Sequence, residues 1–314
     1  MAARDFFVTP LLESIRDRCM LPASDDTLND ARLLRFVNDE LQGFMSDLLL
    51  TLREEHNIQP FDVGPIATGG NRFRIPPRAL GSVLREVRVL RGADEIPTVR
   101  LELDSRPDEV NFTAHMPYWL EGDDIVFTRS PLGQGDVIRF RCFYMPQLAY
   151  PGDHLPIATI ASDRKSFTFD RTGLPTAGAT PDTWPATPQP IDFIRLEGSN
   201  YPRGLGTAVA TIAPSGLTGT VTLAGTATVP NDITVGHYAT QAGKTVAAAL
   251  PEFLQPTLAQ RVAYVALRAI GDPKAEAALA QLVEMKANAI RLMQPRTEAQ
   301  PRFIINRYSP GWRR

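Results

Sequence analysis

The pattern that most constrains the fold is a pair of helices in residues 251–293. Apolar residues recur at alternating steps of three and four, which places them on one side of each helix. In the second helix they are Ala275, Ala278, Leu282, Met285, Ala289 and Leu292, and in the first Leu254, Leu258, Val262, Val265 and Ala269. Gly271-Asp272-Pro273 between them supplies residues suited to a helix end, an N-cap and a first helical position. The sequence predicts an αα-hairpin with an alanine-rich packing face.

Two more helices are expected near the N-terminus. A short one from Thr9 to Cys19 ends before Pro22, and a long one begins at Leu28 or Asn29, where capping-box spacing occurs, and ends at about Glu55. The long helix carries two apolar stripes, Leu34, Val37, Leu41, Phe44, Leu48 and Met45, Leu49, Leu52. Because a face this wide needs partners on two sides, we expect both ends of the chain, 1–62 and 249–294, to form one helical bundle.

Between the predicted helices the spacing of apolar residues changes from steps of three and four to steps of two. Apolar residues alternate with charges in Val87/Val89, Val99/Leu101/Leu103 and Ile138/Phe140/Cys142/Tyr144, which is typical of strands with one wet face. Residues 121–124, EGDD, indicate a hairpin turn. We expect an inserted antiparallel β-module at 63–150, a Pro/Thr/Gly-rich loop or arm at 151–190 and a second small β-module at 191–248. The predicted fold class is α+β: a helical bundle with an inserted antiparallel β region and an extended C-terminal arm.

Composition excludes several classes of protein. A chain of 314 residues allows about two domains. A net charge of -2 gives no global attraction to nucleic acid or to an anionic membrane. No leader pattern and no run of about 18 apolar residues occurs, so neither secretion nor a membrane span is expected. Cys19 and Cys142 lack a CxxC partner and are interpreted as free thiols in a reducing cytoplasm.

Motifs that would carry chemistry are mostly missing. The four histidines, His56, His115, His154 and His237, have no metal-ligand spacing. Gly243-Lys244-Thr245 ends like a phosphate-binding loop, but Tyr238 stands where the first glycine is needed, so we expect a turn. Asp123-Asp124 fits a hairpin better than a metal site. We expect no enzyme activity, cofactor or metal, although distant carboxylates could still build a hydrolase site.

The last segment, 295–314, has a composition of its own. It is basic and extended, with an apolar centre, and its candidate contact residues are Arg302, Phe303, Ile304, Ile305, Arg307, Tyr308 and Trp312. Such a segment cannot bury itself alone. Two interpretations stay open: a frayed terminus, or an arm that adds a strand to a partner or wedges into it.

Five stretches in three regions of the chain together resemble a known family. They are LLESIRDRCMLPASDDTLNDARLLRFVNDELQGFMSDLLLTLREEH, then RIPPRALGSVLREVRVL with PYWLEGDDIVFTR and IRFRCFYMPQL, and finally LPEFLQPTLAQRVAYVALRAIGDPKAEAALAQLVEMKANAIRLMQPR. In pattern and layout they are similar to the head-to-tail adaptor (connector or neck) proteins of tailed bacteriophages. The resemblance covers both ends and the first β-module, and residues 151–248 add little to it.

The resemblance implies a structural virion protein, made in the host cytoplasm. Family members form a ring, usually of twelve copies, between the capsid portal and the tail or its nozzle, continue the DNA channel without sequence-specific binding, and help to retain the packaged genome. The arm at 295–314 would dock on the portal, where many copies multiply a weak contact. Neighbouring copies would meet at Met45, Leu49 and Leu52, with Glu54 and Glu55 at the rim.

An alternative function is a β-rich binding module of a virion or cell envelope that recognises a glycan or a tail fibre. Aromatic side chains that stack on sugars would carry it, and the candidates in the β-modules are Tyr118, Trp119, Tyr144, Tyr150 and Trp184.

Overall fold

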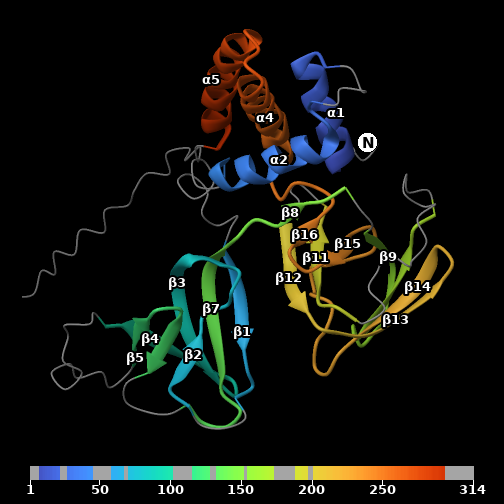
Figure 1. Cartoon of the computed structure of the whole chain (residues 1–314). Coiled ribbons are helices and arrows are strands. Elements are labelled where there is room, and N and C mark those ends of the chain that lie inside the picture. The colour runs from blue at the N-terminus through green and yellow to red at the C-terminus, as the bar shows by residue number, and fades with distance from the viewer. Residues whose placement is uncertain are drawn as a thin grey trace, which may run out of the picture.

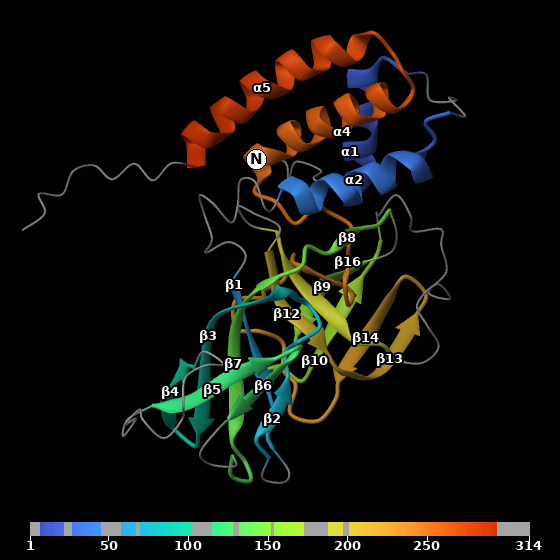
Figure 2. The ribbon, with the colours of Figure 1, turned by 60° about the vertical axis from the view of Figure 1, so that its left-hand side comes forward.

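The computed structural model describes residues 7–21, 27–44, 58–66, 70–101, 115–127, 132–151, 154–172, 188–196 and 201–293. These residues form three parts (Figure 1): a layer of helices and, on one side of it, two β domains that lie next to each other. Figure 2 shows the helical layer lying across the ends of both β domains. The chain passes through the helical layer first, then through the two β domains, and returns to the helical layer.

The helical layer is built from both ends of the described chain. Its helices are α1 (Val8–Cys19), α2 (Asp30–Phe44), α4 (Gln255–Ala269) and α5 (Lys274–Met293), and a short 3-10 turn, η4 (Glu252–Leu254), leads into α4. Helix α4 is central and packs against α1, α2 and α5. One apolar core joins the four helices, with Ile15, Leu33, Leu258 and Val262 fully buried in it. No helix in the described ranges combines the length and the apolar content that crossing a bilayer requires.

The helix ends follow local capping rules. The side-chain oxygen of Asn29 accepts a hydrogen bond from the Arg32 amide at 3.0 Å, so Asn29 caps α2. Gly271 has φ 72° past the end of α4, and the Asp272 carboxylate accepts from the Lys274 amide at 2.8 Å. The αα-hairpin and its turn are therefore confirmed. Two residues of the predicted stripes are misplaced. Ala269 at the end of the first helix is exposed, and Leu292 in the second is 63% exposed while its neighbour Met293 is buried.

The first β domain is one bent sheet with strand order β1-β7-β3-β4-β5-β6-β2. The strands are β1 (Ile58–Val63), β2 (Arg72–Arg74), β3 (Ala79–Arg91), β4 (Asp94–Arg100), β5 (Met116–Glu121), β6 (Asp124–Phe127) and β7 (Val137–Tyr144). Strand β4 pairs with β3 through residues 94–97 and with β5, in parallel, through 98–100. The sheet therefore folds over at β4 and encloses a core that includes Val89, Ile125 and Phe140. The predicted hairpin turn joins β5 to β6.

The second β domain also has seven strands, in the order β12-β11-β15-β9-β10-β14-β13. They are β9 (Leu155–Ile160), β10 (Ser166–Asp170), β11 (Ile191–Arg195), β12 (Tyr201–Thr207), β13 (Val209–Ser215), β14 (Thr218–Leu223) and β15 (Tyr238–Gln241). The two outermost strands, β12 and β13, are separated in sequence by Ala208 alone. A flat sheet would put these strands at opposite edges, so the sheet must curl back on itself around its core of Phe167, Phe193 and Val221.

The expected α+β fold, a helical bundle with a small antiparallel insertion, is wrong. Of the described residues 40% lie in strands and 29% in helices, and two seven-stranded sheets dominate the molecule. Two of the pairings, β4 with β5 and β8 (Leu148–Ala149) with β16 (Lys244–Thr245), are parallel. The loop predicted for 151–190 instead contains β9 and β10. These strands were missed because their alternating apolar patterns are short and lie next to Pro/Thr/Gly-rich sequence. In β10, for example, the pattern consists of Phe167 and Phe169, which are both buried.

Candidate functional site

The residues that the sequence proposed for portal docking and for contact between copies lie outside the described residues. This holds for the arm, Arg302, Phe303, Ile304, Ile305, Arg307, Tyr308 and Trp312, and for the lateral contact, Met45, Leu49, Leu52, Glu54 and Glu55. Among the candidate aromatic residues that the structure describes, only Trp119 and Tyr150 have side chains that reach the surface. Tyr118 and Tyr144 are buried in the protein, while Trp119 is half-buried and Tyr150 is 40% exposed. Trp184 also lies outside the described residues.

A buried carboxylate, Asp192 on β11, joins the two β domains. It is completely buried and accepts four hydrogen bonds. Arg78, from the turn before β3 in the first β domain, donates to Oδ2 at 2.6 Å, and Gln147, from the linker after β7, donates to the same atom at 2.7 Å. The amide of Gly243 donates to Oδ2 at 2.8 Å and that of Gly206 to Oδ1 at 2.7 Å. We call this cluster the Asp192 joint.

The backbone around Asp192 is shaped to supply these donors. Opposite Asp192 the pairing of β11 with β12 shifts, so that two residues of β12 stand against one of β11, and Gly206 lies in this bulge with φ 64°. Gly243 occupies the turn between β15 and β16 with φ 85°. Both conformations favour glycine. Of the turn predicted for Gly243-Lys244-Thr245 only Gly243 is confirmed, because Lys244 and Thr245 form strand β16. The Gly243 amide binds an internal carboxylate.

A short parallel pair, β8 with β16, connects the β domains to the helical layer. The Asn38 side chain on α2 accepts from the Ala149 amide at 2.7 Å and donates to the Ala149 carbonyl at 3.2 Å, as a neighbouring strand would. The Val8 amide donates to the Val246 carbonyl at 2.6 Å, and Phe7 forms a bridge with Ala247. Residues 145–150 and 243–250, the hub, therefore contact all three parts of the molecule.

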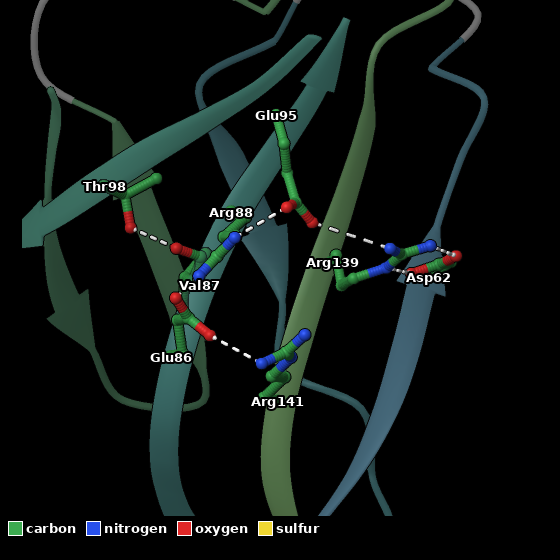
Figure 3. Close-up of polar contacts among 8 residues, drawn as sticks. All are labelled: Asp62, Glu86, Val87, Arg88, Glu95, Thr98, Arg139 and Arg141. Carbon is green, nitrogen blue, oxygen red and sulfur yellow. Dashed lines mark hydrogen bonds and ion pairs between the residues drawn. The ribbon is translucent and has the colours of Figure 1, made fainter. Parts of the chain in front are cut away.

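A ladder of charges covers the outer face of β1, β7, β3 and β4 (Figure 3). Arg88 on β3 and Arg139 on β7 are directly opposite each other in register, which is unfavourable for like charges. Glu95 on β4 contacts both, at 2.6 Å to Arg88 and 3.6 Å to Arg139. Arg139 also binds Asp62 with two hydrogen bonds at 2.8 and 2.9 Å, and these contacts raise the pKa of Arg139. The positive charges of Arg88 and Arg139 are therefore balanced by acids on the same face.

A pocket of about 150 Å³ opens between α1 and the start of α4. Its walls are mainly apolar, with Ser14, Arg18 and Gln255 as polar members and Phe7, Pro10, Leu11, Pro256 and Ala259 as the rest. The Arg18 guanidinium donates to the Gln260 side chain at 2.7 Å. Among the described residues no carboxylate pairs with Arg18, and burial lowers its pKa. We call this feature the Arg18 pocket.

The remaining candidates for chemistry are dispersed. Cys19 and Cys142 are both buried and free, one in the helical layer and one in the first β domain. Within the described ranges no three His, Cys, Asp or Glu side chains gather as metal ligands would. No protein-family model matches the sequence, and no curated protein matches it.

Sequence reasoning missed both the Asp192 joint and the Arg18 pocket. Asp192 stands in an otherwise apolar strand, IDFIR, and a lone acid among buried strand residues is the one signal that could have identified it. Its partners come from positions 78, 147, 206 and 243, which no local pattern connects. Arg18 follows Asp17 on a helix, and no local sequence pattern distinguishes it as a binding residue.

Proposed function

We propose that this chain is a structural assembly protein, an adaptor that forms a ring between the portal and the tail of a tailed bacteriophage and continues the DNA channel. The observation that carries the proposal is the helical layer, in which α1 and α2 from one end of the chain pack on α4 and α5 from the other. Both of these ends, together with the first β-module, carry the family resemblance in sequence. The helical layer is the ring wall, and residues 295–314 follow directly after α5 as the portal-docking arm.

The attachment of the helical layer to the β domains supports a structural role. An adaptor must transmit the position of one partner to another, which requires parts that do not move independently. The Asp192 joint ties the two β domains together, and Asn38 and Phe7 tie the helical layer to the hub. The ring has no enzymatic role in this proposal, and DNA passes through it without sequence-specific binding.

The test compares the full chain with a chain that ends at Gln294, each mixed with the portal ring encoded beside it and weighed by native mass spectrometry. We expect the full chain to load the portal to a symmetric complement, usually twelve, and the shortened chain to fail. Circular dichroism and thermal unfolding of both forms provide the control that the shortened chain is folded. If the full chain does not bind any portal ring, the adaptor function is wrong, and glycan arrays with Trp119→Ala as the probe become the next experiment.

A further inference from the structure

The Arg18 pocket contains a guanidinium that pairs with no carboxylate among the described residues. Its guanidinium is held in place by a relay, because Gln260 accepts from Arg18 and donates in turn to the Ala278 carbonyl at 3.1 Å. Gln260 is buried, so this relay is fixed within the core between α4 and α5. An arginine that is positioned in advance, next to apolar walls and with no ion-pair partner among the described residues, is suited to receive a carboxylate from outside.

The pocket also limits the size of what it can receive. A cavity of about 150 Å³ accommodates a group about as large as benzene, and not a whole helix. The occupant must therefore present one compact apolar side chain, with a carboxylate close beside it. The exposed acids Glu13 and Asp17 on α1 directly precede the lining residues Ser14 and Arg18 in the sequence, and they disfavour a partner that is acidic throughout.

Helix α5 of this same chain presents such a combination on its outer face. Val283 is 62% exposed, and the next residue, Glu284, is exposed as well. Among the described residues Glu284 has no ion-pair partner. Ala280 and Ala287, one turn before and after, are exposed and small, so another surface can approach the helix closely. We call these four residues the α5 outer face.

The Arg18 pocket and the α5 outer face belong to different sides of the helical layer. Helices α1 and α5 both pack against α4, and Figures 1 and 2 show them on different sides of it. Two complementary surfaces on different sides of one molecule cannot satisfy each other within a copy. Between copies they make a head-to-tail contact, which closes into a ring when the rotation between neighbours is suitable.

We infer that the α5 outer face of one copy docks on the Arg18 pocket of the next, with Val283 in the pocket and Glu284 paired with Arg18. This contact rests on the proposed function only because an adaptor ring needs a head-to-tail interface. It uses other residues than the contact between copies that the sequence predicted at 45–55. Val283 supplies the apolar contact, and the ion pair fixes which surfaces meet.

Charge reversal tests the contact. We expect Arg18→Glu and Glu284→Arg each to weaken self-association of the full chain about tenfold, and the double variant to recover most of the loss, as a coupled pair should. Sedimentation velocity over a concentration series, alone and with the portal ring, measures this. Arg35→Glu and Asp39→Arg, exposed on α2, are the matched controls and are expected to leave association unchanged.

The outcomes separate this inference from the proposed function. If the double variant associates no better than the single ones, or if Arg35→Glu weakens association as much as Arg18→Glu, the contact is wrong. A ring that forms on the portal regardless of residues 18 and 284 refutes the contact and leaves the adaptor function standing. A wild-type chain that stays monomeric both alone and with the portal ring refutes both.

Discussion

Arg78 of the first β domain donates to Asp192 of the second at 2.6 Å, and the carboxylate that it meets is completely buried. A buried charge of this kind is tolerated because four groups donate hydrogen bonds to it. The contact between the two β domains therefore includes an ion pair. Loss of the Asp192 carboxylate would affect both β domains, because Arg78, Gln147 and two glycine amides all donate hydrogen bonds to it.

Asp192→Ala is expected to lower the free energy of unfolding by about 3–5 kcal/mol, because it leaves the partly buried Arg78 and several other donors unpaired. Urea denaturation followed by circular dichroism measures the change. Asp62→Ala, which removes a 45% exposed partner of Arg139, is the control and is expected to cost less than about 1 kcal/mol. Equal losses in the two variants would show that the Asp192 joint does not contribute to stability as described.

Glu95→Gln is expected to destabilise the first β domain in low salt and much less in high salt. The substitution removes the charge that separates Arg88 from Arg139, and salt screens the repulsion that remains between two exposed guanidiniums. We expect a fall in melting temperature of about 2 °C at 20 mM salt that largely disappears at about 1 M. A fall that does not depend on salt would mean that packing, and not charge, explains the role of Glu95.

Asn38→Ala is expected to loosen the helical layer from the hub. It deletes both hydrogen bonds to Ala149, one of which satisfies a backbone amide. Leaving such groups unpaired costs about 1–3 kcal/mol. Hydrogen exchange detected by NMR should show faster exchange of the Ala149 amide, with the amides of β14 as an internal control. Unchanged protection at Ala149 would contradict the attachment.

Met293→Ala is expected to destabilise the protein by about 2 kcal/mol or more, and Leu292→Ala to change stability by less than about 0.5 kcal/mol. The reason is that Met293 is 1% exposed and Leu292 is 63% exposed. Chemical denaturation of the two variants makes a matched comparison of neighbouring residues. A larger loss of stability for Leu292→Ala than for Met293→Ala would contradict the structure and support the stripe that the sequence predicted.

The two thiols are expected to be inert in the folded protein. Burial raises the pKa of Cys19 to about 11 and that of Cys142 to about 12, above the usual value of about 8.5. Because folding favours the protonated thiols, their contribution to stability is complete below about pH 8.5 and is lost as the pH rises toward 11 to 12. A thiol reagent at pH 8 should label neither cysteine until the protein is unfolded. Rapid labelling of native protein would contradict this burial.

The helices were the predictable part of this fold, and particular residues show why. The spacing of Leu254, Leu258 and Val262 and the turn at Gly271-Asp272-Pro273 are local signals, and each corresponds to a buried side or a cap. Leu292 was misassigned because 3.6-residue periodicity cannot separate neighbours at the edge of a stripe.

The β domains were underestimated because their pairing is not local. Strand β9 contacts both β10 and β15, and β12 is the neighbour of β11 although β13 follows it after Ala208 alone. No sequence period encodes these pairings. The Asp192 joint shows the same limit, since its donors are up to 114 residues from the carboxylate that they bind.

The hub gives the molecule a particular response to mechanical load. Strands β8 and β16, the Asn38 contacts to Ala149 and the bridge from Phe7 to Ala247 lie close together where the helical layer meets the β domains. A force that pulls the helices away from the sheets is therefore shared by these attachments at the same moment and cannot break them one after another. The protein should resist such a pull with little gradual yielding and then give way in a single step.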